Sequence, residues 1–432
     1  MIEKLIGRAR ESLFTVPIII VGLCAGAAGL ALYVDFNFAD VIDDWPIVLR
    51  TTVQGGRGIA TTVASATITV AAIVFSITAL STQMAASQYS PRALGGFFED
   101  PFQQAIIGLV VGTFTYSLLV LASLSNAIID GGDPTPSLSV TIAMLLGVAS
   151  AIGIVAYINH SLKRMQIDSV VQRIAAGATK AIDRHLKDRA TEGAPEGRPP
   201  TGEQTAIRAT HTGWIIDIDV DELLRTLPPA STARVDVRLG EAVSAGDRLI
   251  TLWPSPGDDW DQTDRARSTV VTARERSLEL DPTFGIRQLV DIALRALSPG
   301  VNDPTTAVDV IHHLKTPIRE VLLSGAPRRV FAGPDERRVF LTETMTRSDY
   351  VHAAFSEIRL AASAQPYVLT ALIEVLEDLK SDLDGAGLEG RESAVAQELE
   401  LTLETARTSG LPEPDLKRVL ERSRGEGDQD PS

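Results

Sequence analysis

The chain has 432 residues, 45% of them hydrophobic, and carries a formal charge of −15 at pH 7. This length leaves room for a membrane part and at least one soluble domain, while the acidic balance argues against wholesale nucleic-acid binding, which needs a basic face. The single cysteine excludes an intrachain disulfide and a metal cluster built from cysteine alone.

The first apolar segment covers residues 14–34 and follows three basic residues within the first ten positions. Its length suits a helix that crosses a membrane, and the basic flank favours a start on the cytoplasmic side. Gly22 and Gly26 form a G-x-x-x-G step, which predicts close contact with another helix.

The second segment organises the chain. Residues 58–91 contain no Asp, Glu, Lys, Arg or His, and a helix of that length would reach roughly 50 Å, well beyond a ~30 Å hydrocarbon core. We expect the span itself at residues 59–86. Alternating steps of three and four place small and hydroxyl-bearing residues on one helix face. These residues are Thr62, Ser65, Thr69, Ala72, Ser76, Ala79, Gln83 and Ala86.

Two interpretations of this face remain open. In the first, small residues let helices approach closely and the hydroxyls bond across the contact. In the second, copies of the helix line a water-filled path in an oligomer, and the polar side chains replace part of an ion's hydration. The predicted lining residues are Thr62, Ser65, Thr69, Ser76 and Gln83, and the predicted cytoplasmic mouth is Gln88, Tyr89 and Arg92.

Two further apolar segments, at residues 102–124 and 138–158, complete a membrane domain that we expect to cover residues 1–164. Basic residues lie at the amino terminus, at Arg92 and directly after the fourth span, whereas the opposite flanks carry only Arg50 and Arg57. This distribution predicts a protein of the bacterial inner membrane with four spans and both termini in the cytoplasm.

The remainder is predicted to be a cytoplasmic α/β domain. Apolar residues at helical spacing over residues 165–190 predict a stalk that continues the fourth span, or else an amphipathic helix on the lipid surface. A Pro- and Gly-rich linker follows at residues 191–206. A two-residue period then predicts a small β module at 207–262 and gives way to a mainly helical region at 263–424. Residues 425–432 read as a disordered tail.

Within the β module, residues 238–250 resemble the glycine-turn pattern of small barrels of the biotinyl or lipoyl carrier type. Such a carrier attaches its cofactor to a lysine, and no lysine lies between Lys187 and Lys315. We therefore expect a barrel-like module without the swinging-arm chemistry. Further on, short strands are expected around residues 329–331 and 338–342.

No residue pattern points to an enzyme. His312 and His313 are adjacent, so on a regular helix their side chains point about 100° apart and cannot easily share one metal. Asp281, Asp303 and Asp309 would make an acidic site, but the first two precede prolines and are better explained as helix caps. Phosphate-binding loops and nucleophile elbows are missing from the sequence. We expect no catalytic residue, no metal and no cofactor.

Two motifs carry a family resemblance: FSITALSTQMAASQYSPRAL at residues 75–94 and RQLVDIALRALSPGVNDPTTAVDVI at residues 287–311. Together with the four spans, they resemble a bacterial family of predicted membrane proteins known only as a domain of unknown function, DUF2254. The resemblance covers most of the chain, from about Arg8 to beyond Leu379. It implies an inner-membrane location and no established activity.

These features favour a homo-oligomeric passive channel for ions or small solutes, with the second span as its lining and membrane lipid around it. The alternative is a membrane-anchored sensor or scaffold whose cytoplasmic part binds a protein or small ligand, with Asn302 and Asp303 in an exposed loop.

Overall fold

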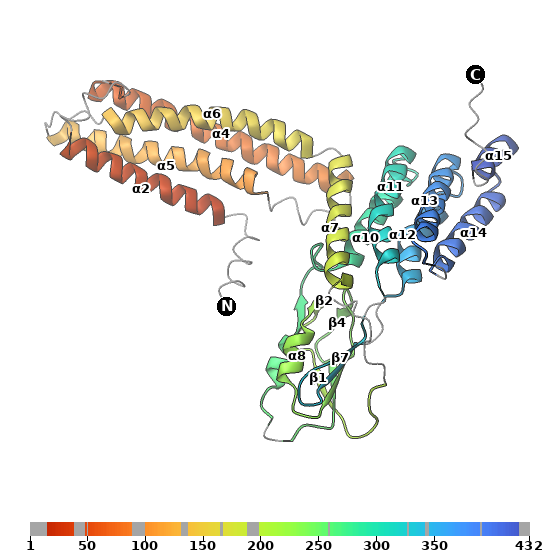
Figure 1. Cartoon of the computed structure of the whole chain (residues 1–432). Coiled ribbons are helices and arrows are strands. Elements are labelled where there is room, and N and C mark those ends of the chain that lie inside the picture. Colours follow the sequence, from red (N-terminus) through yellow and green to blue (C-terminus); the bar gives the residue numbers. More distant parts are fainter. Residues whose placement is uncertain are drawn as a thin grey trace. The chain divides into compact units, whose positions relative to one another are not determined.

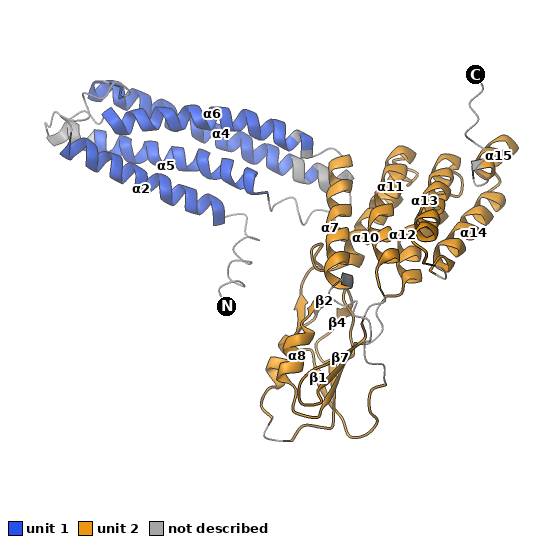
Figure 2. Ribbon diagram, in the orientation of Figure 1, with its two compact units in different colours: residues 1–166 blue, residues 167–432 orange. Residues whose placement is uncertain are grey.

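The computed structural model describes residues 15–38, 48–49, 51–88, 100–130, 137–164, 167–187, 198–257, 260–325, 328–341, 345–388 and 391–422. The chain divides into two compact units, residues 1–166 and residues 167–432 (Figure 2).

The first unit is a bundle of long helices (Figure 1). Four of its helices are long and apolar enough to cross a membrane, as the sequence predicts. Their bounds are α2 Thr15–Asn37, α4 Val53–Gln88, α5 Pro101–Asp130 and α6 Ser137–Arg164. The longest of them is α4, with 36 residues.

Small residues set the spacing inside this bundle. An added Cβ at Gly108 of α5 would lie 2.9 Å from Ile20 Cδ1 and 3.0 Å from Pro17 Cα, so α2 and α5 touch almost backbone to backbone. Gly112 faces Cys24 of α2 in the same way. By contrast, nothing lies within 4 Å of the positions where Gly22 and Gly26 would carry a Cβ. Their predicted helix contact is therefore not made among the residues that the structure describes.

The second unit begins with α7, Ile167–Lys187, whose apolar residues lie on one side. Val170, Ile174, Ala178 and Ile182 are buried, and α7 packs against α10 and α11. Because this apolar side is covered by protein, it is not available to lie on a lipid surface. The remaining helices of this bundle are α10 Pro282–Ala296, α11 Pro304–Leu323, α12 Arg347–Ala361, α13 Pro366–Gly385, α14 Ser393–Thr408 and α15 Glu413–Arg422.

Helix capping was correctly predicted at two starts in this unit. Asp281 accepts from the backbone N–H groups of Thr283 and Phe284 at the start of α10. Asp303 accepts from Thr306 N at the start of α11. Each cap is followed by a proline at the first helical position, where the missing N–H costs nothing.

The strands form two sheets, with strand orders β1-β5-β3-β8-β7 and β4-β2-β6. The outer strands of each sheet are not joined to each other, so a closed barrel is not shown. The five-stranded sheet also extends beyond the expected module, because β8 pairs in parallel with β3 from about 100 residues away. The bounds are β1 Thr205–Arg208, β2 Gly213–Ile218, β3 Thr232–Val235, β4 Ala242–Val243, β5 Arg248–Trp253, β6 Val270–Ala273, β7 Val330–Ala332 and β8 Arg338–Leu341, with the short helices α8 Val220–Thr226 and α9 Thr263–Ser268 beside them.

One arginine connects the three-stranded sheet to the helices. The Arg276 guanidinium lies over the ring of Trp214 in β2 and over the ring of Phe284 in α10, at 5.5 and 5.1 Å from their centres. It also pairs at 2.7 Å with Asp281, which is fully buried. Gly240, with φ +76°, passes so close that a Cβ there would meet both charged groups. The ion pair, the two cation–π contacts and the close approach of the Gly240 backbone together hold the three-stranded sheet against α10.

Candidate functional site

Helix α4 presents two different faces. One face is buried in the bundle through small side chains, among them Ala60, Ala64 and Ala71, and it packs against α5 and α6. The opposite face is not covered by the described part of the chain. It includes the residues that sequence periodicity placed together, beside the exposed apolar side chains of Ile73 and Leu80.

All five predicted lining residues lie on that exposed face, and all are solvent-accessible in the isolated chain. Thr62, Ser65, Thr69, Ser76 and Gln83 therefore share one side of α4. Sequence periodicity alone did not reveal which of the two small-residue faces of α4 would be buried by its neighbours.

The hydroxyl groups on this face point back along the helix. Thr62 Oγ1 donates to Gly58 O at 2.8 Å, Thr69 Oγ1 to Ser65 O at 2.9 Å, and Ser76 Oγ to Ala72 O at 2.8 Å. Each hydroxyl hydrogen is thus used inside the helix. The hydroxyl oxygens keep lone pairs that point away from the helix, and these can accept hydrogen bonds or contact a cation.

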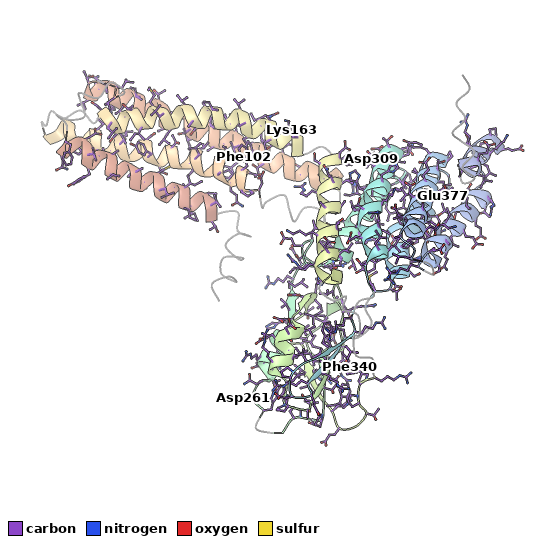
Figure 3. All side chains as sticks on the ribbon, in the orientation of Figure 1. Phe102, Lys163, Asp261, Asp309, Phe340 and Glu377 are labelled. Atoms are coloured by element: carbon purple, nitrogen blue, oxygen red, sulfur yellow. The ribbon has the colours of Figure 1, made fainter. Side chains whose placement is uncertain are left out.

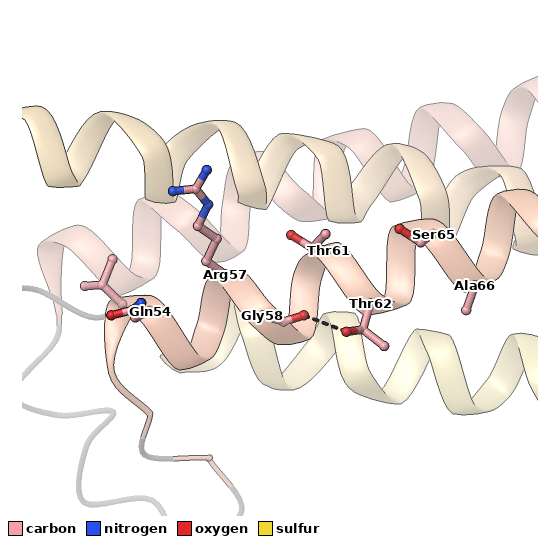
Figure 4. A pocket seen from close by; sticks show the side chains of 8 residues that line it. Gln54, Arg57, Gly58, Thr61, Thr62, Ser65 and Ala66 are labelled. Atoms are coloured by element: carbon pink, nitrogen blue, oxygen red, sulfur yellow. Dashed lines mark hydrogen bonds between the residues drawn. The ribbon is translucent and has the colours of Figure 1, made fainter.

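A hollow of about 1210 Å³ lies along residues 53–66, the first part of the same helix (Figure 4). In the described part of the chain, its lining residues all belong to α4: Val53, Gln54, Arg57, Gly58, Thr61, Thr62, Ser65 and Ala66. Figure 4 shows Gln54, Arg57 and Thr61 along this stretch. Arg57 makes no ion pair within the described residues, so its charge is uncompensated there.

Sequence reasoning missed Gln54 because it began the uncharged stretch at residue 58, and it missed Thr61 because it began the face at Thr62. It named Arg57 only as a charge flanking the span. The signal was nevertheless present. Gln54, Gly58, Thr61 and Ser65 follow the same steps of three and four as the rest of the face.

A second set of polar groups lies inside the bundle. Thr78 Oγ1 and Tyr157 OH are 2.6 Å apart between α4 and α6. Thr113 Oγ1 and Ser150 Oγ are 3.0 Å apart between α5 and α6, and both residues are buried. Hydroxyl pairs of this kind hold membrane helices together. The Thr78–Tyr157 pair therefore holds the interior face of α4 against α6, in contrast to the uncovered face.

Ionisable side chains in the bundle sit at helix ends. Asp35 of α2 accepts hydrogen bonds from the backbone N–H groups of Leu138 and Ser139, at 3.0 and 2.8 Å. Asp100 caps α5 and pairs with His160 Nε2 at 2.7 Å. The Phe102 ring, labelled in Figure 3, lies 4.8 Å from the His160 ring. Asp35 and Asp100 thus form hydrogen bonds at the ends of the bundle helices. Among the described residues, the uncovered face of α4 carries no carboxylate.

The other predicted site residues are placed as follows. Gln88 is the last residue of α4, while Tyr89 and Arg92 lie outside the described residues. Asn302 is exposed with φ +48°, and its Oδ1 accepts from Gln365 Nε2 at 3.2 Å. Asp303 is engaged by Thr306, through the backbone N–H at 3.1 Å and the hydroxyl at 2.6 Å. In the described part of the chain, no group of three or more His, Cys, Asp or Glu side chains is arranged to hold a metal ion.

Comparison with known proteins establishes the family. The profile of a family described as "Predicted membrane protein (DUF2254)" matches residues 10–378. The chain belongs to this family. Uncharacterized protein Mb1321c of Mycobacterium bovis and uncharacterized protein Rv1290c of Mycobacterium tuberculosis are each 30% identical to this DUF2254 member over 420 residues. The alignment covers 95% of this chain and 79% of theirs. No solved structure matches this DUF2254 member.

Proposed function

We propose that this protein is a homo-oligomeric passive channel for ions or small solutes, with the uncovered face of α4 as its lining. The observation that carries the proposal is that Thr62, Thr69 and Ser76 lie on a face that the chain's own helices leave open. Four helices that pack closely through small residues leave little room for a conduit among them. The path is therefore assigned to the space between copies.

The hydroxyl chemistry suits this role. Because each hydroxyl hydrogen is donated to the carbonyl four residues earlier, the oxygen presents lone pairs to the path. Oxygen atoms of this kind replace part of the hydration of a passing cation or accept hydrogen bonds from a small solute. The same hydrogen bond to the backbone also satisfies a hydroxyl that faces lipid or another helix. The experiment must therefore distinguish a face that lines water from a face that packs against another helix.

The charged end of the hollow gives the path a defined entrance. Gln54 and Arg57 lie in the first turns of α4, and the basic residues of the chain concentrate on the other side of the spans. By the positive-inside rule we place Arg57 at the outer mouth, in an inner-membrane protein with both termini in the cytoplasm. An arginine at a pore entrance concentrates anions there.

We prefer this proposal to a ligand-sensing loop or an enzyme. Asn302 and Asp303, the residues expected to face a ligand, both use their side-chain oxygens in hydrogen bonds within the second unit. No catalytic constellation is apparent among the described residues.

The test is single-channel recording of purified protein in planar lipid bilayers. We expect conductance that falls strongly when Ser76→Leu fills the lining, while Val155→Leu, an exposed position on α6, leaves it unchanged. Absence of conductance across a range of salts, voltages and membrane tensions would overturn the channel. Equal conductance of the Ser76→Leu variant and the parent would remove α4 as the lining.

A further inference from the structure

The second unit carries few large apolar side chains on its surface. Among its described residues, three are exposed: Val301 at 52%, Leu360 at 63% and Tyr367 at 57%. They come from two turns that are about 60 residues apart in the chain. Val301 lies between α10 and α11, whereas Leu360 and Tyr367 flank the turn between α12 and α13.

These two turns lie side by side. Gln365 Nε2 donates to Asn302 Oδ1 at 3.2 Å, which ties one turn to the other. Asn302 adopts φ +48°, a left-handed conformation that reverses the chain directly after Val301. Helix packing agrees, because α10 contacts α12 and α11 contacts α13. The three side chains therefore share one end of the helical bundle, which we call the apolar end.

The same end contains the start of α7. Helix α7 packs against both α10 and α11. At the opposite end of α7, the His185 ring bonds to Leu280 O just before α10 begins. Helix α7 thus runs parallel to α11 and antiparallel to α10, and it starts at the apolar end.

Chain length keeps that start close to the bilayer. The fourth apolar span ends at Ser161, and α7 starts at Ile167, six residues later. Even fully extended, six residues reach only about 20 Å. The start of α7, at the end of the second unit that carries Val301, Leu360 and Tyr367, is therefore joined to the end of the fourth apolar span by a short segment of chain.

The local chemistry fits a lipid interface. The turns read LSPGVN and LAASAQPY, without a charged residue, although 45 acidic residues outnumber 32 basic ones after Arg164. Aliphatic side chains insert into the boundary between headgroups and acyl chains, and tyrosine favours the same depth because its ring is apolar and its hydroxyl is polar. The two turns themselves add no charge to this end, although Asp168 in the first turn of α7 and Asp303 at the start of α11 lie beside them.

From this placement we propose that the apolar end docks on the bilayer, with Val301, Leu360 and Tyr367 inserted at the lipid interface beside the exit of the fourth span. The docking holds the second unit against the membrane that its own chain crosses. It does not depend on conduction through α4, so the two proposals fail separately.

The test uses the full-length chain with Cys24→Ala, reconstituted in vesicles of phosphatidylethanolamine and phosphatidylglycerol. A nitroxide label is attached to Val301→Cys or Tyr367→Cys, and its collisions with oxygen and with a water-soluble nickel chelate are measured. The matched control is Ala386→Cys, an exposed site just past the far end of α13, about 30 Å from Tyr367 along the helix. All three positions are exposed, so labelling removes no core contact; unchanged thermal unfolding confirms the fold.

We expect the ratio of oxygen to nickel collisions at 301 and 367 to exceed that at 386 at least about twofold, as for side chains inserted some 5–10 Å into the interface. Equal ratios at all three sites would overturn the proposal. Shielding of 301 and 367 from both reagents would overturn it as well, because it would show that protein, such as a second copy, covers the apolar end.

Discussion

The Asp35 carboxylate at the end of α2 accepts hydrogen bonds from both the backbone N–H and the hydroxyl of Ser139 on α6, at 2.8 and 2.5 Å. Asp35 is only 2% exposed. One helix thereby caps the buried start of another, and the charge of a carboxylate beside the apolar core is stabilised by N–H donors at a helix amino terminus. This contact ties the first span to the last.

Replacing Asp35 should loosen the bundle. In Asp35→Ala the N–H groups of Leu138 and Ser139 lose their acceptor, and each unsatisfied buried donor costs about 1–3 kcal/mol. Unfolding of the detergent-solubilised protein by denaturing detergent should show a matching loss of stability. Asn37→Ala is the control, since among the described residues its amide donates to Tyr33 O of its own helix. Equal stability of the two variants would contradict the capping role.

Small-residue contact between α2 and α5 gives a second prediction. In Gly108→Ala the added Cβ meets Pro17 Cα at 3.0 Å, and because a backbone atom cannot move aside cheaply, we expect a loss of about 1–3 kcal/mol. Gly26→Ala places the same methyl in open space and should leave the stability of the isolated chain unchanged. Detergent-induced unfolding of both variants compares them directly. A similar loss in both would mean that the effect is not packing.

These residues show how far sequence reasoning reaches. Helix caps such as Asp303-Pro304 were predictable because the cap and its target are three residues apart, and the spans followed from length and hydropathy alone. The role of Asp35 was not predictable, since its partner Ser139 is about 100 residues away and the pattern around Asp35 resembled an acidic external loop. Local chemistry identifies local partners.

The candidate site shows the same limit. Periodicity correctly grouped Thr62, Thr69 and Ser76 on one face of α4, yet Ala60, Ala64 and Ala71 make an equally small face on the other side. Only the arrangement of α5 and α6 decides which is covered. The pairing of β8 with β3 was likewise beyond a local pattern, because parallel neighbours in a sheet can be supplied from anywhere in the chain.

The proposed channel makes a prediction about charge at its entrance. A unit charge contributes about 1 kcal/mol at ~4 Å in water, so Arg57→Glu should shift the ratio of cation to anion permeability about fivefold or more toward cations. Reversal potentials in asymmetric salt measure this ratio. Arg57→Lys keeps the charge and should keep the selectivity. An unchanged reversal potential in Arg57→Glu would exclude Arg57 from the ion path.

The junction around Arg276 predicts a strong effect on the second unit. Arg276→Met retains apolar volume between Trp214 and Phe284 but leaves the buried carboxylate of Asp281 without its guanidinium. Breaking a buried pair in this way costs about 3–5 kcal/mol, which thermal unfolding of the full-length protein would detect. Arg225→Met removes an exposed arginine, 67% accessible, and should leave the melting temperature unchanged. If both variants melt alike, Asp281 does not depend on Arg276.

A pH effect follows from Asp309 on α11. Burial raises the pKa of its carboxyl above the ordinary value, and the negative charges of Asp168 and Asp303 raise the pKa further, against the opposing influence of His312 and His313. A raised pKa in the folded state means that ionisation is more costly there than in the unfolded chain. The stability associated with protonated Asp309 is therefore fully present below the unfolded pKa of 3.8 and is lost as pH rises through the folded pKa.

Asp309→Asn should accordingly stabilise the second unit at about pH 7, by up to about 0.5 kcal/mol for a partly exposed site, and the gain should shrink toward about pH 4. Urea unfolding of variant and parent at a series of pH values measures the difference. A constant difference across the series would show that the substitution acts through packing rather than charge. A destabilised variant at neutral pH would mean that the ionised carboxylate has a favourable partner, contrary to the direction of its pKa shift.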